Sequence, residues 1–238
     1  MNLLEARDVS RHFGGLRAVD GVDLSLEDRG IHAIIGPNGA GKTTFVSLLC
    51  GRLSCSAGTI RFDGEDITGL PAWRRARRGI AYTFQITSIF PRLTVRENLA
   101  IAVQGCSTRR EDPGPRVTDI LARVDLPDRT GEAAGTLPYG HQRLLEVGMG
   151  LALAPRLLIL DEPTQGLSNS EINHFCGLVR NIAWDAAVLL IEHNMRVVME
   201  LADRITVLDH GRVLSRGTPA QIRSDPAVQA AYLGTGAD

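Results

Sequence analysis

The sequence has no apolar run long enough to cross a membrane and no marked excess of charge of either sign. Its 26 basic residues are balanced by 27 acidic residues, which gives a formal net charge of -1. This balance argues against a general nucleic-acid binder, because such proteins carry a basic excess. The first 15 residues are also too polar for a signal peptide. We therefore expect a soluble globular protein.

Cysteine is scarce, and its spacing excludes two kinds of cross-linked fold. No C-x2-C pair is present, so the sequence predicts neither a zinc site nor a disulfide framework. A reducing cytosol fits this pattern. Hydrophobic residues make up 44% of the 238 residues, enough for one large domain with a real core and an inserted subdomain. The four cysteines are Cys50, Cys55, Cys106 and Cys176.

A glycine-rich segment, residues 36–44, follows an apolar run that we expect to be a strand. Its glycines allow backbone torsions and close approaches that a Cβ forbids, so successive N–H groups can converge on a phosphate. This arrangement predicts an anion cradle. The segment reads Gly36, Pro37, Asn38, Gly39, Ala40, Gly41, Lys42, Thr43 and Thr44.

The helix that we expect after this cradle strengthens the prediction. It covers residues 42–50, has Gly51 as its stop, and directs its positive end at the bound phosphate. Lys42 can reach the β- and γ-phosphates, and the hydroxyl of Thr43 is placed for Mg²⁺. The alternative is an ordinary glycine-rich turn, but the strand before the segment and the helix after it favour a nucleotide site.

A second apolar run, residues 157–160, ends in Asp161 and Glu162. Such a run is typical of a strand buried on both faces of a parallel sheet, and we expect it to adjoin the phosphate cradle. Carboxylates near a core are costly unless compensated, and Mg²⁺ offers compensation. Asp161 would hold the metal, and Glu162 would orient or deprotonate the attacking water. The alternative is an acidic pair at a helix N-terminus.

Three further side chains lie at strand ends or turns and are candidates for the same site. Phe13, in a glycine-flanked turn, either stacks on a purine or packs in the core. Gln85 ends a strand predicted over residues 80–84, at an edge where ligands meet α/β sheets. His193 follows a strand predicted over residues 188–191 and can donate a hydrogen bond to phosphate or water, with a structural role as the alternative.

Antiparallel strands are predicted around the cradle, over residues 3–9, 22–26 and 58–62. A short helix over residues 71–78 carries the only dense basic cluster of the sequence. A solvated helix face is favoured for this cluster over a binding patch. The cluster comprises Arg74, Arg75, Arg77 and Arg78.

From Ile86 onward the character of the sequence becomes helical. Residues 95–104 and 117–124 have helical periodicity, and a Gly/Pro/charge-rich break separates them. A largely apolar helix is expected over residues 140–154. This region is a candidate helical insertion, and it is followed by strands, a helix over residues 195–201, a hairpin and one C-terminal helix.

Five motifs in this order resemble one family across nearly the whole chain, the nucleotide-binding subunits of ATP-binding-cassette transporters. They are GPNGAGKTT, TFQ at Gln85, LPYGHQ over residues 137–142, LLILDEPTQGLS over residues 157–168, and IEHNM around His193. The resemblance implies an α/β fold with a P-loop NTPase (RecA-like) core, an antiparallel β-subdomain and an inserted α-helical subdomain. Residues 1–85 and 155–238 would form the core with the β-subdomain, and residues 86–154 the helical subdomain.

The resemblance also implies roles for individual residues. Two subunits would pack head to tail, with each ATP between the P-loop of one and the signature of the other. Phe13 would stack on adenine, Glu162 would be the base and His193 would sense the γ-phosphate. Gln85 would link the nucleotide to the membrane partner. The metal would be held by Thr43, Gln85 and Asp161; the signature comprises Leu137, Pro138, Tyr139, Gly140 and His141; Leu167 and Ser168 would touch the opposite site.

The signature departs from the usual LSGGQ of this family. Pro138 replaces a serine and has neither a hydroxyl nor an N–H to donate. The start of the following helix can still favour phosphate. We therefore expect weaker or slower sandwich formation than a serine would give. Ser168 stands where an aspartate is frequent in the family, which leaves that contact open.

FGGLRAV near the start and DPAVQAAYLG near the end resemble the importer group for branched-chain amino acids, with its relatives for urea and amides. This resemblance implies membrane permease subunits, a second nucleotide-binding subunit and, indirectly, a substrate-binding protein as partners. It places the chain on the cytoplasmic face of the inner or plasma membrane, without an added regulatory domain. The alternatives are a soluble cassette ATPase and a nucleotide-dependent regulatory module.

Overall fold

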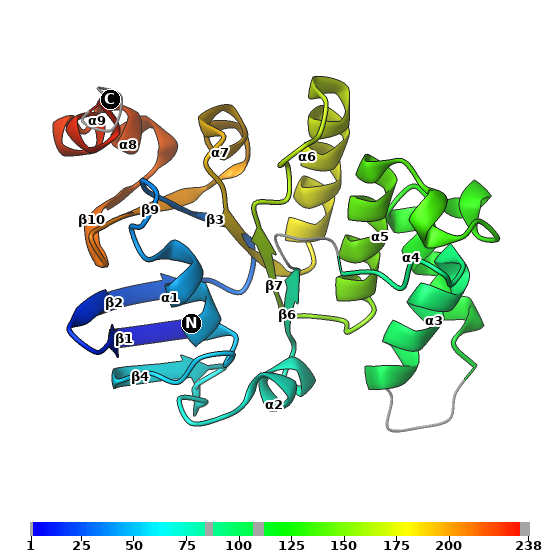
Figure 1. Cartoon of the computed structure of the whole chain (residues 1–238), viewed down its shortest axis with the longest axis horizontal. Coiled ribbons are helices and arrows are strands. Elements are labelled where there is room, and N and C mark those ends of the chain that lie inside the picture. Colours follow the sequence, from blue (N-terminus) through cyan, green and yellow to red (C-terminus); the bar gives the residue numbers. More distant parts are fainter. Residues whose placement is uncertain (1, 84–87, 107–111, 234–238) are drawn as a thin grey trace.

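The computed structural model describes residues 2–83, 88–106 and 112–233, which form two sheets and a lobe of helices (Figure 1). The smaller sheet is antiparallel and has the order β2-β1-β4-β5. The three strands predicted here are confirmed, and each is longer than predicted. The bounds are β1 (Leu4–Phe13), β2 (Leu16–Leu26), β4 (Ala57–Phe62) and β5 (Glu65–Asp66).

The larger sheet has the order β10-β9-β3-β8-β7-β6. Its strands pair in parallel except for the β9–β10 hairpin. Every residue of β7 and β8 is buried, as expected of strands covered on both faces. The bounds are β3 (Gly30–Ile35), β6 (Ile80–Thr83), β7 (Leu157–Asp161), β8 (Ala187–Ile191), β9 (Arg204–Asp209) and β10 (Arg212–Gly217).

The strand order places β8 between β7, the strand that ends in Asp161, and β3, the strand before the cradle. Both β7 and β3 pair with β8 in parallel, so their carboxyl ends still meet at one edge of the sheet. The periodicity of the sequence indicates that the strands are buried, but it carries no information on which strand lies in the middle.

Two hydrophobic cores lie on opposite faces of this sheet. Alternate residues of β7 belong to different cores: Leu158 and Leu160 pack with the helical lobe, while Leu157 and Ile159 pack with α1 and the antiparallel sheet. This alternation follows from the period of two in a strand. The bounds of the helices before the lobe are α1 (Lys42–Leu49) and α2 (Ala72–Arg77).

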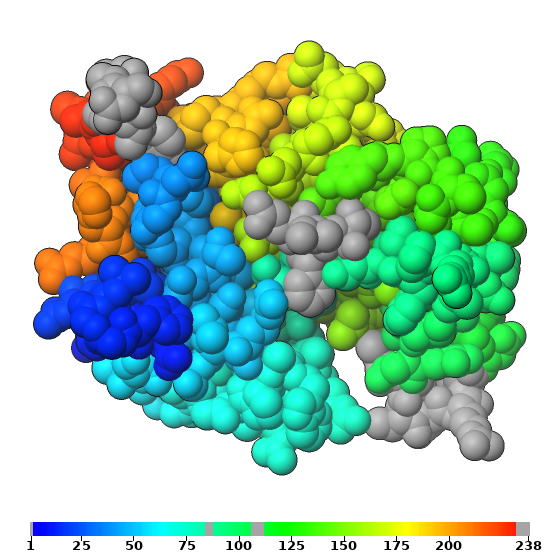
Figure 2. Space-filling view, in the orientation of Figure 1, coloured from blue at the N-terminus to red at the C-terminus, as the bar shows by residue number. Residues whose placement is uncertain are grey.

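The helical lobe lies beside the sheet and is formed by α3 (Val95–Cys106), α4 (Gly114–Arg123) and α5 (Tyr139–Leu151) (Figure 1). The predicted helices are confirmed there, and the 3₁₀ turns η1 (Pro127–Arg129) and η2 (Ala134–Thr136) complete the lobe. Figure 2 shows the surface hollowed between α2 and the residues of α3. The proposed division of the chain at residues 86 and 154 stays a prediction.

The helix α6 (Asn169–Ala183) was not predicted. It begins with a capping box in which Ser168 and Glu171 satisfy each other's backbone N–H groups. This S-x-x-E spacing is a readable start signal. The C-terminal part forms two helices where one was expected, because Pro226 holds Asp225 in an extended conformation. The remaining helices are α7 (Met195–Leu201), α8 (Pro219–Ser224) and α9 (Pro226–Leu233).

The basic helix α2 differs from its prediction at one residue. Arg75 is only 1% exposed, whereas a solvated face was expected for the whole cluster. Its guanidinium donates to the carbonyl oxygens of Leu48 and Leu49 at the end of α1, each at 2.8 Å. It also donates to the carbonyls of Thr68 and Leu70, both at 2.9 Å. A cation at a helix C-terminus supplies donors to carbonyls that have no partner within the helix.

None of the helices in residues 2–83, 88–106 and 112–233 combines the length and the apolar character needed to cross a bilayer.

Candidate functional site

The glycine-rich segment connects β3 to α1 at the carboxyl end of the sheet. A Cβ on Gly36 would lie 2.1 Å from the carbonyl oxygen of Leu208, and one on Gly41 would lie 2.3 Å from the carbonyl oxygen of Ala18. Gly41 is the N-cap of α1 with φ 94° and supplies no side-chain cap. The sequence therefore needs glycine at both positions, and the N-terminus of α1 keeps its N–H groups for a ligand.

Lys42 folds back over this segment. Its Nζ donates to the carbonyl oxygens of Gly36 at 2.7 Å and Pro37 at 2.9 Å, and the side chain is buried. Burial lowers the pKa of Lys42, while the negative charges of Glu162 and Asp161 act in the opposite direction. The charges of Glu162 and Asp161 thus favour the protonated form of the Lys42 amine.

A cavity of ≈ 490 Å³ opens over the glycine-rich segment. Backbone and side chains from four separate parts of the chain form its wall, including the β9–β10 turn. Polar and apolar groups are mixed there, as a nucleotide with its charged and aromatic parts requires. The lining residues are Leu16, Arg17, Ala18, Asn38, Gly39, Ala40, Gly41, Lys42, Thr43, Thr44, Glu162 and His210.

Asp161 ends β7 and is 2% exposed. Its Oδ2 accepts a hydrogen bond from the Tyr82 hydroxyl at 2.7 Å. Burial raises the pKa of Asp161, and the Tyr82 hydrogen bond opposes that rise. Tyr82 on β6 was not predicted as a site residue; its position directly before the TFQ motif is the sequence signal.

Glu162 follows with φ 47°, a left-handed conformation that is uncommon for a residue with a side chain. Its N–H donates to the carbonyl of Ile191 at 2.8 Å, which fixes the end of β7 against the end of β8. Glu162 Oε1 lies 3.8 Å from His193 Nδ1. Such backbone strain is concentrated at functional sites, where it orients a side chain.

The carboxylate of Glu192 holds the loops around this pair. It is 1% exposed, and its Oε1 accepts from the N–H and the hydroxyl of Thr164 at 3.0 and 2.6 Å. Its Oε2 accepts from the N–H groups of His193 and Asn194 at 3.1 and 3.3 Å. Sequence reasoning gave Glu192 no role. An acidic residue directly after a buried apolar run was the available signal.

The donor set fits a magnesium ion that shares its ligands with a phosphate. Asp161 and Thr43 supply the hard oxygen atoms that Mg²⁺ prefers. Among the described residues no group of three or more His, Cys, Asp or Glu could hold a metal alone. A metal at this position would therefore need ligands from the triphosphate and water, as is usual for Mg²⁺.

The signature residues lie apart from this cavity, at the start of α5. Pro138 is the N-cap of α5 and provides no side-chain cap, and Tyr139 is 43% exposed. Gly140 is buried directly against α6: a Cβ there would lie 2.3 Å from Glu171 Oε1. The start of α5 therefore presents free backbone N–H groups beside an exposed aromatic ring.

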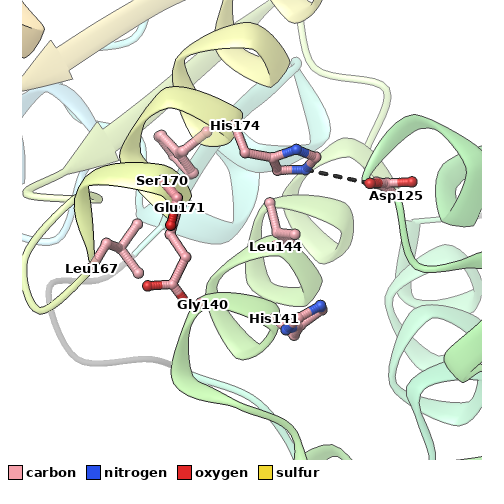
Figure 3. A pocket seen from close by; sticks show the side chains of 9 residues that line it. Asp125, Gly140, His141, Leu144, Leu167, Ser170, Glu171 and His174 are labelled. Atoms are coloured by element: carbon pink, nitrogen blue, oxygen red, sulfur yellow. Dashed lines mark ion pairs between the residues drawn. The ribbon is translucent and has the colours of Figure 1, made fainter.

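Leu167 and Ser168 lie beside the signature. The Ser168 hydroxyl donates to Glu171 Oε2 at 2.6 Å within the capping box of α6. A second cavity of ≈ 260 Å³ lies between parts of α5 and α6, and its wall includes His141 and Leu167 (Figure 3). The walls of the two cavities share no residue. Within the described part of the chain, one subunit thus brings the predicted residues together in two separate places.

Phe13 stands outside both places. Phe13 ends β1 and is 44% exposed, so ordinary core packing is wrong for this side chain. Its ring stacks with the Arg11 guanidinium, 4.7 Å from the ring centroid, and it is not in the wall of the P-loop cavity, where Leu16 lies instead. Stacking of Phe13 on adenine stays a prediction. Gln85 lies outside the described residues.

The sequence pattern of the family described as "ABC transporter" matches residues 19–165. The chain belongs to the ATP-binding-cassette transporter family. It is therefore an ATP-binding subunit that hydrolyses ATP, and the predicted fold class and ATPase activity are confirmed. A second pattern, described as "Branched-chain amino acid ATP-binding cassette transporter", matches residues 212–238.

Named relatives and solved structures agree with this family. The chain is 39% identical to the high-affinity branched-chain amino acid transport ATP-binding protein BraF of Pseudomonas aeruginosa, and 38% identical to LivG of Escherichia coli K12. Both alignments cover 98% of this chain and 98% of the relative. An ATP-binding cassette solved in its ADP conformation has a TM-score of 0.89 at 28% identity, covering 98% of this chain and 99% of that chain. A nucleotide-free cassette has the same TM-score at 27% identity.

Proposed function

We propose that this chain energises an importer for branched-chain amino acids or for related amides and urea. The observation that carries the proposal is the length of the match: relatives named for branched-chain amino acid transport are similar over 98% of the chain. The C-terminal pattern of the same transporter group, over residues 212–238, supports it independently of the ATPase motifs.

In this proposal the P-loop cavity binds Mg·ATP. The N–H groups of residues 36–44 and the Lys42 ammonium bind the phosphates. The ammonium then exchanges its hydrogen bonds to the carbonyls of Gly36 and Pro37 for hydrogen bonds to the phosphates. Thr43, Asp161 and Gln85 hold the magnesium ion, which neutralises charge that develops on the phosphates when it is bound. Phe13 stacks on the adenine.

Glu162 is the proposed base in hydrolysis. Its carboxylate lines the cavity and lies near His193, so a water between Glu162 and the γ-phosphate can be oriented and deprotonated there. His193 contacts the γ-phosphate and orients the Glu162 carboxylate. The buried Glu192 holds the loop of His193 in place through two backbone N–H groups.

A second nucleotide-binding subunit completes the site. The signature residues, with Leu167 and Ser168, lie in a separate place from the P-loop cavity of the same chain. They therefore contact ATP held by the partner, which is this chain or a paralogue. Permease subunits dock in the hollow between α2 and α3 (Figure 2), and a substrate-binding protein delivers the solute. The chain then acts at the cytoplasmic face of the membrane.

Replacement of Glu162 by Gln tests the reaction, and uptake tests the substrate. We expect Glu162→Gln to lower ATP turnover by about 10²- to 10⁴-fold while Mg·ATP still binds, since a general base contributes about that much. Cells that lack the chain should lose leucine uptake and regain it with the wild-type chain but not with Glu162→Gln. The exposed carboxylate variant Glu132→Gln is the control and should behave as wild type.

Two results would contradict this proposal. Undiminished ATP turnover in Glu162→Gln would remove Glu162 from its role. Unchanged uptake of leucine, of amides and of urea in cells without the chain would remove the proposed substrates.

A further inference from the structure

Helix α5 contains an ion pair that is buried on both sides. Arg143 Nη1 lies 2.8 Å from Glu146 Oε2, and the two side chains are only 2% and 5% exposed. Removing two full charges from water is costly, and two apolar side chains of similar size would hold a helix in a core equally well or better. The pair therefore needs a reason other than the stability of α5. It is part of neither cavity wall described above.

Glu146 connects α5 to the segment that follows the TFQ motif. Its Oε1 accepts a hydrogen bond from the N–H of Ser88 at 3.3 Å. Two residues further on, the N–H of Phe90 donates to Oδ1 of the fully buried Asn98 on α3 at 2.7 Å. The chain that leaves the TFQ motif is thus held to two helices of the lobe by buried polar side chains.

Arg143 connects the same pair to the signature. Its guanidinium carbon lies 5.6 Å from the centroid of the Tyr139 ring. The Tyr139 ring in turn rests on Gly166, where a Cβ would lie only 3.1 Å from Cε1 of the ring. Gly166 has φ 80° and lies two residues before Ser168, so a side chain at this position would be strained and would displace the ring.

We propose that Arg143 and Glu146 are positioning residues that join the segment after Gln85 to the signature residue Tyr139 and, through it, to Gly166. The connection runs from Ser88 to Glu146, Arg143, Tyr139 and Gly166, and each step is a direct contact between neighbouring groups.

This inference rests on the proposed function, in which the TFQ segment meets the permease and the signature meets ATP. Movement of one end changes the position of the other because the linking charges are buried and cannot exchange their partner for water. The pair therefore acts on turnover and not on the affinity of the P-loop for ATP.

The experiment compares Arg143→Met, Glu146→Leu and the double variant, with the exposed pair of the same spacing, Arg129→Met with Glu132→Leu, as the matched control. Urea unfolding, the Kd for Mg·ATP, ATP turnover and amide hydrogen exchange are measured on the full chain. The double variant should regain the stability lost in the single variants, because no uncompensated charge stays buried. Its kcat should nevertheless stay about tenfold low, with Kd unchanged.

Hydrogen exchange gives a readout that does not need turnover. In the nucleotide-free double variant, exchange should rise both at residues 88–90 and at residues 164–168, although Gly166 touches neither replaced side chain. A stable double variant with wild-type kcat, or with exchange at 164–168 unchanged, would overturn the proposal. If the wild-type chain neither binds nor hydrolyses ATP, the proposed function fails, and the exchange result still decides the positioning role.

Discussion

The P-loop side and the signature side of this protein are built in different ways. The P-loop side is held by contacts between residues far apart in sequence: Gly41 lies against Ala18, Asp161 accepts from Tyr82, and Glu162 binds Ile191. The signature side combines contacts of both kinds: Tyr139 packs on the distant Gly166, while Ser168 and Glu171 form the capping box of α6 within one turn.

The two sides also differ in exposure. Lys42 and Asp161 are buried within one subunit, whereas Pro138, Tyr139 and Ser168 are exposed. The difference teaches that the P-loop side is organised before ATP arrives, while the signature side presents its groups outward to another molecule. Changes on the P-loop side should therefore affect folding and ATP binding together. Changes on the signature side should affect turnover with little cost in stability.

The largest effect is expected from Arg75→Met, which removes two hydrogen bonds to buried carbonyls at the end of α1 and two to partly buried carbonyls beside it. Within the described residues, only the Leu48 carbonyl of these four has a backbone N–H as a second donor. Losing the four hydrogen bonds should lower the free energy of unfolding by about 3–5 kcal/mol, as measured in urea. Arg74→Met on the exposed face of the same helix is the control and should change it by less than about 0.5 kcal/mol. Equal effects of the two replacements would contradict the assigned role of Arg75.

His32, in the first half of the central strand β3, offers a test outside the walls of both cavities. Burial lowers the pKa of His32 to about 4, and the charges of Arg216 and Arg204 act in the same direction. The unfolded chain binds this proton near the ordinary pKa of about 6.5, so stability is full above pH 6.5 and falls as the pH drops toward 4. The expected loss is about 3 kcal/mol.

Urea unfolding of the wild type and His32→Gln between pH 4 and pH 8 checks this expectation. The variant should show a flatter profile over this window, because glutamine takes up no proton. A wild-type profile that is equally flat would show that His32 is not held in its neutral form by the fold.

An intermediate effect is expected from Gly41→Ala. The positive φ and the 2.3 Å approach to the Ala18 carbonyl leave no room for a methyl group, so the backbone must shift at a cost of about 1–3 kcal/mol. Mg·ATP affinity should fall with it. Gly39→Ala is the matched control, since Gly39 has φ 79° but open space around its Cβ. Isothermal titration and urea unfolding should show larger losses of affinity and stability for Gly41→Ala than for Gly39→Ala. Equal losses would show that the positive φ, and not the contact with Ala18, causes the effect.

The smallest effect is expected from Pro138→Ser on the signature side. A serine at the N-cap of α5 accepts from a backbone N–H and should stabilise the helix by about 1 kcal/mol. It also restores a hydroxyl that can donate to phosphate of the partner subunit. ATP turnover and ATP-dependent dimerisation should rise by up to about tenfold, since about 1.4 kcal/mol of added contact corresponds to that factor. Unchanged turnover and dimerisation would reject the idea that Pro138 weakens the sandwich.

Most residues of the P-loop side could be predicted from the sequence, because the groups that bind phosphate are close together along the chain. Three glycines, Lys42 and two hydroxyls within nine residues fix a phosphate cradle, and an apolar run before Asp161 fixes a buried strand. The parts that were missed depend on contacts between distant segments. Contacts with residues distant in sequence, which no local pattern predicts, determine the exposure of Phe13, the burial of Arg75 at the end of α1 and the role of Glu192.

By itself the sequence determined the order of motifs, the period of its strands and helices, and hence the family of the fold. Only the tertiary structure decided that β8 separates β7 from β3, that Arg143 and Glu146 are buried together, and that the signature and the P-loop of one chain lie in different places. Periodicity reports which face of an element is apolar, because that depends on the residues of the element alone. Which elements become neighbours depends on how all the apolar faces are buried at once, and this is a property of the whole chain.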